Sequence, residues 1–527
     1  MSLGRTMAVG LMGVEGVLVA VEADLAAGLP AFAITGLPDA ACRQSSDRIR
    51  SAAANSGLAI PPRRITVNLS PAWLPKAGSG FDLPIAIAVL VAAGVLPAAA
   101  VADVVHLGEL GLDGSIRPVR GVLPAVLSAA RAGIERVVVP AANHAEAALV
   151  PGIMVHPART LASLVAHHIA AHTGASVVEE DEPQAETGFV PPVSNQPHDG
   201  GPVGEAGPAR DLADVLGQAE ARWALEVAAA GGHHLLLTGP PGTGKTMLAE
   251  CLPWLLPELS GDDALAVTAI HSVLGLLPAG ALVRRAPFVA PHHAASMSAL
   301  VGGGAGMARP GLISQAHAGV LFLDEAPEFQ APVLQALRQP MESGHVTIAR
   351  AHASVRYPAR FQLVLAANPC PCGLAHGKAV ACTCSPRARR DYLGRLAGPL
   401  LDRVDLQVEV PAVSLAVLRG ARGEASSRVA ARVVAARTRQ RHRLSATPWR
   451  LNAQVAGPML RRGPLSLPSA ATVDLDRAIE RGWLTLRGYD RVLRLAWTIA
   501  DLAERAVPQR DDIGRALTLR TRQGVAA

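Results

Sequence analysis

The middle of the chain contains three short apolar runs, and each ends on glycine or on polar residues. They are LLL within HHLLLTG, before residue 239, VLFL within GVLFLDE at 319–325, and FQLVLAA within FQLVLAANP at 361–369. Continuous apolar runs of this length are typical of strands buried on both faces of an α/β sheet. We therefore predict an α/β core whose strands present polar residues at their carboxyl ends, where such sheets hold ligands.

Other stretches have the spacing of helices. Residues 211–230 carry apolar side chains at helical intervals, and 427–443 and 472–520 read as Arg-rich helices. The stretch 83–102 is apolar for about the length of a bilayer span, but it is rich in Ala and Pro97 interrupts it. It predicts a buried helix and a turn rather than a membrane segment, and we expect no membrane partner.

Residues 173–208 differ in composition from both sides, since they are rich in Pro, Gly and acidic residues and lack Lys and Arg. Such a segment buries too little apolar surface to offset its ordering entropy, which predicts a flexible linker. At 527 residues the chain is long enough for several domains. We predict a front domain at 1–172, a nucleotide-binding domain at 209–410 and a helical domain at 411–527.

The charge is uneven along the chain. The net charge is +6, yet 26 Arg face 13 Asp and Glu between Arg387 and Arg522. A basic excess of this size suggests an anionic partner such as nucleic acid, and an Arg-rich solvated face is the alternative. Single arginines carry little weight, because the composition favours Arg over Lys throughout.

The cysteines indicate a compartment and a possible metal site. No signal peptide is read at the N-terminus and no disulfide framework is apparent, so we expect a reducing cytoplasm. Four of the six cysteines form a C-x-C, nine-residue, C-x-C pattern, here called the cysteine cluster. Four thiolates at this spacing suggest a structural Zn²⁺ site, although buried free thiols and redox chemistry are alternatives. The cluster comprises Cys370, Cys372, Cys382 and Cys384.

The loop after the first apolar run fits the phosphate-binding pattern G-x-x-x-x-G-K-[ST] between a strand and a helix. Its glycines let backbone N–H groups surround phosphates, Lys245 would neutralise β/γ charge, and the Thr246 hydroxyl would hold Mg²⁺. The sequence therefore predicts ATP and Mg²⁺ as cofactors. The predicted binding residues are Gly239, Pro240, Pro241, Gly242, Thr243, Gly244, Lys245, Thr246 and Asp324.

Two further strands end on residues suited to hydrolysis. Asp324 suits the Mg²⁺ shell, and Glu325 suits the base that polarises the attacking water. Asn368 could orient that water beside the γ-phosphate. In GPLLDRVDL, Arg403 lies between two acidic residues. It either forms a surface ion pair or acts as an arginine finger on a neighbouring subunit's nucleotide, and the second role requires a ring of subunits.

The order of these motifs resembles the AAA+ ATPases, specifically the magnesium-chelatase-like branch. GHHLLLTGPPGTGKT, APHHAASMSALVGGG, GVLFLDEAPEF, AANPCPCG and GPLLDRVDL together are similar to the YifB/ComM family over nearly the whole chain. The resemblance implies a homohexamer, Arg403 as the trans-acting finger and Asn368 as a sensor. It also implies a C-terminal helical lid whose second sensor is Arg487, with Arg491, one turn later, as the competitor.

Two segments near the ATP motifs are candidates for DNA contact. Adjacent His292 and His293 have no acidic neighbour in the sequence and are unlike metal ligands, and the small residues of 288–304 fit a mobile insert. The alternation in 345–361 predicts a β-hairpin that carries Arg350 and Arg356. The resemblance implies that the insert faces the pore of a ring. A basic hairpin there would grip a phosphate backbone, unless it is an ordinary surface hairpin.

The front domain resembles the α+β Lon protease domain through KAGSGFDLPIAIAVL and HLGELGLDGSIRPVRGVLPAVL. On that pattern the nucleophile's position falls on Gly80 and the lysine's on Leu123, and neither residue can do the chemistry. Ser79 is adjacent but lacks a lysine partner. We predict a domain kept for binding or assembly rather than proteolysis.

Three functions remain for comparison. The resemblance implies a DNA motor that drives unwinding or branch migration in recombination or natural transformation, with branched or single-stranded DNA as partner. A magnesium or cobalt chelatase motor subunit is the alternative, but the chain lacks a D-x-S-x-S metal-adhesion motif. An ATP-dependent protease conflicts with Gly80 and Leu123, and a protein-remodelling ATPase stays open.

Overall fold

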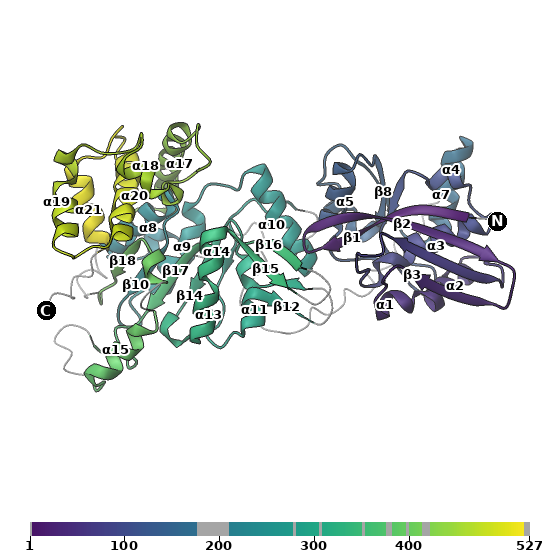
Figure 1. Cartoon of the computed structure of the whole chain (residues 1–527), viewed down its shortest axis with the longest axis horizontal. Coiled ribbons are helices and arrows are strands. Elements are labelled where there is room, and N and C mark those ends of the chain that lie inside the picture. The colour runs from purple at the N-terminus through teal and green to yellow at the C-terminus, as the bar shows by residue number, and fades with distance from the viewer. Residues whose placement is uncertain are drawn as a thin grey trace.

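The computed structural model describes residues 3–175, 210–277, 281–304, 308–349, 354–375, 382–396, 400–413 and 422–520. Most of the predicted linker 173–208 lies outside these ranges, as does Arg350. Figure 1 shows three parts along the long axis of the molecule: the N-terminal domain at one end, the nucleotide-binding core in the middle and the C-terminal helices at the other end.

The N-terminal domain is built on a seven-stranded mixed sheet in the order β3-β4-β2-β1-β5-β8-β9. Every residue of helix α3 is buried, and Pro97 precedes the short α4, so the apolar stretch 83–102 is a core helix and a turn, as predicted. The elements are β1 Leu3–Met12, β2 Glu15–Ala26, β3 Ala31–Thr35, α1 Ala40–Arg43, α2 Ser45–Asn55, β4 Arg64–Ser70, a 3-10 turn Ser79–Phe81, α3 Asp82–Ala92, α4 Ala98–Val101, β5 Val104–His106, β6 Glu109–Leu110, β7 Ile116–Arg117, α5 Val122–Arg131, β8 Arg136–Pro140, a 3-10 turn Ala141–Asn143, α6 His144–Ala147, β9 Met154–Ala158 and α7 Leu161–Thr173.

The nucleotide-binding core is an α/β domain with a parallel five-stranded sheet in the order β11-β14-β17-β10-β18, which confirms the predicted fold class. The three apolar runs form β10, β14 and β17, which are neighbours in this sheet. The elements are a 3-10 turn Leu212–Asp214, α8 Ala219–Gly231, β10 Leu235–Thr238, α9 Lys245–Leu255, α10 Gly261–Leu274, β11 Phe288–Val289, α11 Met297–Val301, β12 Gly302–Gly303, β13 Arg309–Pro310, α12 Leu312–Gln315, β14 Val320–Leu323, a 3-10 turn Ala326–Glu328, α13 Ala331–Ala336, α14 Arg338–Ser343, β15 His345–Ala349, β16 Ser354–Pro358, β17 Gln362–Ala367, α15 Pro386–Gly394, a 3-10 turn Leu401–Arg403 and β18 Leu406–Glu409.

The C-terminal helices pack onto the core as a lid. Apolar side chains of α17 and α20, such as Val433 and Leu495, belong to the same buried cluster as Leu235 and Leu248 of the core. The lid therefore does not have a hydrophobic core of its own. Its elements are α17 Ser426–Arg443, a 3-10 turn Asn452–Gln454, α18 Gly457–Arg461, α19 Ser469–Glu480, α20 Leu486–Leu502 and α21 Arg510–Arg520.

The N-terminal domain contacts the core through α5 and α10. The Gly121 N–H donates to the Ser272 carbonyl at 3.3 Å, the Ser272 hydroxyl donates to Glu146, and Ala269 packs in the cluster formed around α5. A side chain on Gly13 would collide with Val355 of the β15–β16 hairpin. The N-terminal domain therefore contacts the β15–β16 hairpin, which the sequence predicted. None of the helices in the described ranges combines the length and apolar character that crossing a bilayer requires.

Candidate ATP site

The predicted phosphate-binding loop joins β10 to α9 at the carboxyl edge of the parallel sheet. Gly242 and Gly244 have φ values of 75° and 90°, a left-handed backbone that favours glycine. Gly239 has no room for a side chain, because a Cβ would lie 2.2 Å from the Val410 carbonyl oxygen. The glycines therefore shape a loop that exposes its backbone at the start of a helix, where anions bind.

Lys245 lies inside this loop and is 8% exposed. Its Nζ donates to the carbonyls of Gly239 at 2.7 Å and Pro240 at 2.8 Å, and to Asn368 Oδ1 at 3.1 Å. Burial lowers the pKa of the Lys245 ammonium, and the negative charges of Asp324 and Glu325 oppose that shift. The ammonium is thus held where phosphate would enter, next to the predicted sensor.

Asp324 and Glu325 follow β14 at the same edge of the sheet. Asp324 Oδ2 accepts the Thr246 hydroxyl at 2.8 Å, so the two predicted Mg²⁺ ligands already touch. Glu325 has a φ of 48°, a backbone conformation that non-glycine residues rarely adopt and that is frequent at functional sites. Its carboxylate is half-exposed and available to solvent.

One contact at this edge was not expected from the sequence. His293 Nδ1 lies 3.9 Å from Glu325 Oε2, and the His292 and His293 rings are 4.1 Å apart between centroids. The histidines therefore do have an acidic neighbour, which the fold supplies from a strand end more than thirty residues later. The insert prediction for 288–304 was also incomplete, because its first residues form β11, an edge strand of the core sheet.

The predicted arginines lie at the amino ends of the strands, the amino edge of the sheet, opposite to the carboxyl edge that holds the phosphate-binding loop. Arg403 and Asp405 come just before β18, which runs parallel to β10 with Leu406 opposite Leu235 and Glu409 opposite Thr238. The phosphate-binding loop follows Thr238, and strands rise about 3.3 Å per residue, so more than about 10 Å separates these arginines from the loop of their own chain.

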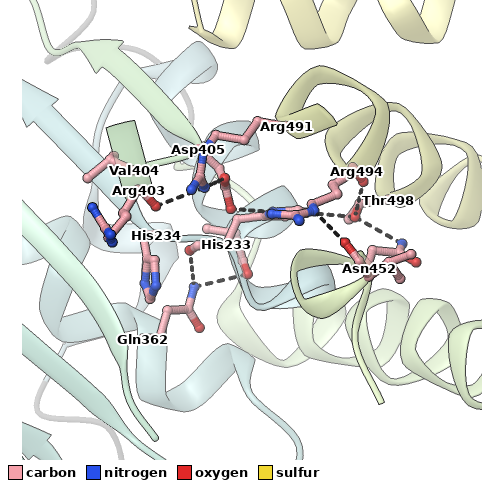
Figure 2. Close-up of polar contacts among 12 residues, drawn as sticks. His233, His234, Gln362, Arg403, Val404, Asp405, Asn452, Arg491, Arg494 and Thr498 are labelled. Carbon is pink, nitrogen blue, oxygen red and sulfur yellow. Dashed lines mark hydrogen bonds and ion pairs between the residues drawn. The ribbon is translucent and has the colours of Figure 1, made fainter. Parts of the chain in front are cut away.

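The structure separates the two candidate lid arginines by burial. Arg491 is 14% exposed; it pairs with Asp405 and donates to the Arg403 carbonyl at 2.9 Å, as Figure 2 shows. Arg487 is 74% exposed, and its nearest acidic partner is Asp402 at 3.9 Å. Arg403 is paired with Glu342. Arg403, Arg487 and Arg491 line a common cavity of about 200 Å³.

A buried polar chain behind these arginines joins the core to the lid. Asp405 Oδ2 contacts His233 Nδ1 at 2.9 Å, His233 Nε2 contacts the Thr498 hydroxyl at 2.8 Å, and Asn452 donates to Thr498 at 3.0 Å (Figure 2). Burial raises the pKa of the Asp405 carboxyl, but Arg491 and His233 together hold it well below its ordinary value. Sequence reasoning missed this chain, because its members are far apart and each is unremarkable alone.

The cysteine cluster lies beside the ATP site. Its four sulfur atoms lie within 4.8 Å of one another, and among the described residues this is the one set of three or more His, Cys, Asp or Glu side chains close enough to share a metal ion. Cys370 Sγ is 3.3 Å from Cys372 Sγ and 3.7 Å from Cys382 Sγ. The cluster could therefore hold a metal ion, as predicted.

The remaining sequence candidates have mixed outcomes. The hairpin is present, with Val346, Ile348, Val355 and Tyr357 buried and Arg356 exposed beside His345 at 2.9 Å. Many arginines of the basic C-terminal region are engaged in ion pairs within the chain, as between Arg432 and Glu226 at 2.6 Å or Arg443 and Asp501 at 2.5 Å. The basic excess therefore gives less support to a nucleic-acid partner than the sequence suggested.

The residues at the expected peptidase positions belong to the packing and turns of the N-terminal domain. Leu123 is fully buried in α5, and Gly80 lies in the turn before α3, next to Val119. The Ser79 hydroxyl donates to Glu109, and the buried Lys76 donates to the Pro71 carbonyl. The nearby serine and lysine are thus engaged with other partners.

Comparisons with known proteins agree with this geometry. The family described as "Magnesium chelatase, subunit ChlI" matches residues 211–418, its C-terminal part matches 423–520, and "Subunit ChlI of Mg-chelatase" matches 21–143. An uncharacterized protein of Mycobacterium tuberculosis is 50% identical over 521 residues, 99% of each chain. YifB of Escherichia coli, also uncharacterized, is 39% identical over 526 residues, 99% of this chain and 97% of its own.

A third relative has a functional name. Competence protein ComM of Haemophilus influenzae is 40% identical over 504 residues, 95% of this chain and 94% of its own. The parallel five-stranded sheet and the phosphate-binding loop agree with the AAA+ relationship of this family. The chain belongs to the YifB/ComM family of magnesium-chelatase-like AAA+ ATPases.

Proposed function

We propose that the chain hydrolyses ATP at the carboxyl edge of its parallel sheet. The convergence of Lys245, Asn368, Thr246 and Asp324 within hydrogen-bond distances is the observation that carries this proposal. Lys245 would exchange its two carbonyl partners for phosphate oxygens, and Thr246 and Asp324 have the hard oxygen donors that Mg²⁺ prefers. A bound Mg²⁺ would neutralise phosphate charge during transfer.

The residues around the phosphates have separate tasks in this proposal. Glu325 would take a proton from the attacking water, because its carboxylate is exposed at the same edge as Asp324. Asn368, held by Lys245, would orient that water with its amide. These two side chains come from neighbouring strands, β14 and β17, so the sheet fixes their separation.

We further propose that the active unit is a homo-oligomer, a hexameric ring, in which each site is shared between two copies. Arg403 and Arg487 lie at the end of the sheet opposite to the phosphate-binding loop of their own chain. In a head-to-tail ring, the Arg403 and Arg487 of one copy would reach the phosphate-binding loop of the next copy. Arg487 is the better candidate for a second sensor than Arg491, because Arg491 is buried in its pair with Asp405. A guanidinium from the neighbour would stabilise charge on the transferred phosphoryl group.

The proposed work of the ring is to move DNA, by unwinding or branch migration during recombination or natural transformation. The full-length similarity to a competence protein supports this role. The exposed Arg356 on the β15–β16 hairpin supplies one cation that could meet a phosphate backbone. We place this activity in the cytoplasm, where the six free cysteines would stay reduced.

The test is the steady-state ATPase rate without polymer, with single strands, with a forked or four-way DNA junction, and with a denatured protein. Glu325→Gln serves as the blank. Stimulation by branched or single-stranded DNA that disappears at high salt supports the DNA motor. No response to any DNA contradicts it.

The same experiment distinguishes the alternatives. Stimulation by the denatured protein alone indicates a protein-remodelling ATPase. A magnesium or cobalt chelatase role is favoured by the family descriptions that match all three parts of the chain. In that case neither polymer stimulates ATP hydrolysis, and a tetrapyrrole with its metal-inserting partner does.

A further inference from the structure

The cysteine cluster has the dimensions of a closed tetrahedral metal site. Thiolates around Zn²⁺ lie about 2.3 Å from the metal, which places any two sulfurs of a tetrahedron about 3.8 Å apart. The sulfur separations are 3.3 Å for Cys370–Cys372, 3.7 Å for Cys370–Cys382 and 3.6 Å for Cys372–Cys382. The fourth sulfur, of Cys384, lies within 4.8 Å of the others. These separations exceed a disulfide bond of about 2.05 Å and fit a shared ion.

The type of donor atoms determines which metal ion the cluster favours and whether the site is structural or catalytic. Four soft thiolates favour Zn²⁺ over Mg²⁺ or Ca²⁺, which prefer oxygen. A site that fills all four positions with protein ligands leaves none for water or substrate, as in structural zinc sites. The C-x-C spacing is tighter than the usual C-x-x-C, but the fold brings the two pairs together from either side of residues 373–381.

The cluster is attached to the ATP site through both of its ends. Cys370 comes two residues after Asn368, whose side chain accepts from Lys245 at 3.1 Å. Gly373, at a φ of 76°, packs so closely on the phosphate-binding loop that a Cβ would lie 2.6 Å from Pro241 Cγ. The first cysteine pair is therefore flanked in sequence by Asn368, which contacts Lys245, and by Gly373, which packs on the phosphate-binding loop.

The second cysteine pair leads into α15, which returns to the same place. Ser385 follows Cys384 and caps α15, with its hydroxyl accepting from the Ala388 N–H at 3.1 Å. Tyr392 on this helix is 4% exposed, and it lies close enough to Asn368 for the Asn368 backbone to oppose the rise that burial causes in the pKa of its phenol. An ion bound by the cluster would thus fix both the chain that directly follows Asn368 and the helix that returns to it.

We propose that the cysteine cluster binds one structural Zn²⁺ ion, which fastens Asn368 and α15 against the phosphate-binding loop. The ion takes no part in ATP chemistry. Its binding deprotonates the thiols and holds the two cysteine pairs together, so ion binding stabilises the local fold of the described residues around them. The metal site itself stands independently of the DNA role, and only its link to Asn368 rests on the proposed ATP site.

The first test is metal content. The full chain, purified without added metal or chelator, is expected to carry one zinc ion per chain by elemental mass spectrometry. Cys382→Ser/Cys384→Ser should lose at least about 90% of that zinc, because two ligands cannot hold a structural site. Cys42→Ala, which removes a buried cysteine of the N-terminal domain, should keep it. A wild-type chain that holds iron, or one that holds no metal and has reactive thiols in the cluster, overturns the proposal.

A second measurement keeps the test valid if the double variant fails to fold. Wild-type protein stripped of zinc and given Co²⁺ should develop the absorption bands of a tetrahedral thiolate site, and zinc should abolish them. Absence of these bands contradicts the site. The link to Asn368 is read by hydrogen exchange: metal removal should speed exchange of 366–373 at least about 10-fold and leave 3–12 unchanged. Unchanged exchange at 366–373 refutes the fastening role, whatever the response of the ATPase to DNA.

Discussion

The two edges of the parallel sheet differ in how they use charged residues. At the carboxyl edge, Lys245 is held inside a loop shaped by glycines, Asp324 accepts from the Thr246 hydroxyl, and Glu325 stays open to solvent. At the amino edge, Asp405 and Arg491 are buried in a pair that joins core to lid, while Arg487 is exposed. The residues at the first edge all contact one another within one chain or lie beside those contacts. The second combines structural charges with others that, in the proposed ring, act on another copy.

The comparison predicts that substitutions at the carboxyl edge cost activity and little stability. Glu325→Gln should lower the ATPase rate by about 10³-fold, within the range expected for loss of a general base. ATP binding and the melting temperature should stay close to those of the wild-type chain, since the side chain is half-exposed. Titration with a fluorescent ATP analogue and a thermal scan measure both. A variant that hydrolyses ATP at more than a tenth of the wild-type rate would assign the base elsewhere.

At the amino edge, two arginines on one helix should give opposite results. Arg491→Ala leaves Asp405 buried without its guanidinium, which should lower the free energy of unfolding by about 3 kcal/mol. Arg487→Ala removes an exposed side chain and should change stability by less than about 0.5 kcal/mol. In the proposed ring, however, it should slow hydrolysis about 10-fold or more.

Urea unfolding and ATPase assays on the two variants give this contrast. Equal destabilisation by both would show that burial does not separate their roles. A fully active Arg487→Ala would remove it from the proposed site.

A pH-dependent effect is expected from a buried histidine before β14, at the amino edge. His317 is 2% exposed, and burial, with help from Arg360, lowers its pKa from 6.5 to about 4. Because the unfolded chain takes up this proton at higher pH than the folded one, stability is fully present above about pH 6.5 and is lost as pH falls toward 4. The loss amounts to roughly 3 kcal/mol at most.

The pH dependence of unfolding is checked with His317→Asn. His317 Nδ1 accepts a hydrogen bond from the Arg360 backbone N–H at 3.0 Å, and the amide oxygen of Asn can accept the same bond. This variant should have a shallower loss of stability between pH 6.5 and 4. An unchanged slope would assign the acid sensitivity to other histidines.

The carboxyl edge was predictable because its residues are local in the sequence. The phosphate-binding loop is eight consecutive residues, and the second and third apolar runs end directly before Asp324 and Asn368. The amino edge was not, since His233, Asp405 and Thr498 come from three distant segments and meet only through β10, β18 and α20. Arg487 and Arg491 are one turn apart, so spacing alone could not show which is buried. The two-residue β11 was too short to be separated from the insert that follows it.

The most direct test of an ATP site shared between two copies is to mix two inactive variants. Lys245→Ala lacks the phosphate-binding ammonium, and Arg403→Ala lacks the proposed finger, so each alone should hydrolyse almost no ATP. In rings formed from equal amounts of both, a site made from the intact loop of one variant and the intact arginine of the other should work. The expected recovery is about one quarter of the wild-type rate, for random head-to-tail assembly. No recovery in mixtures that demonstrably co-assemble would contradict the claim that ATP is hydrolysed between copies of this chain.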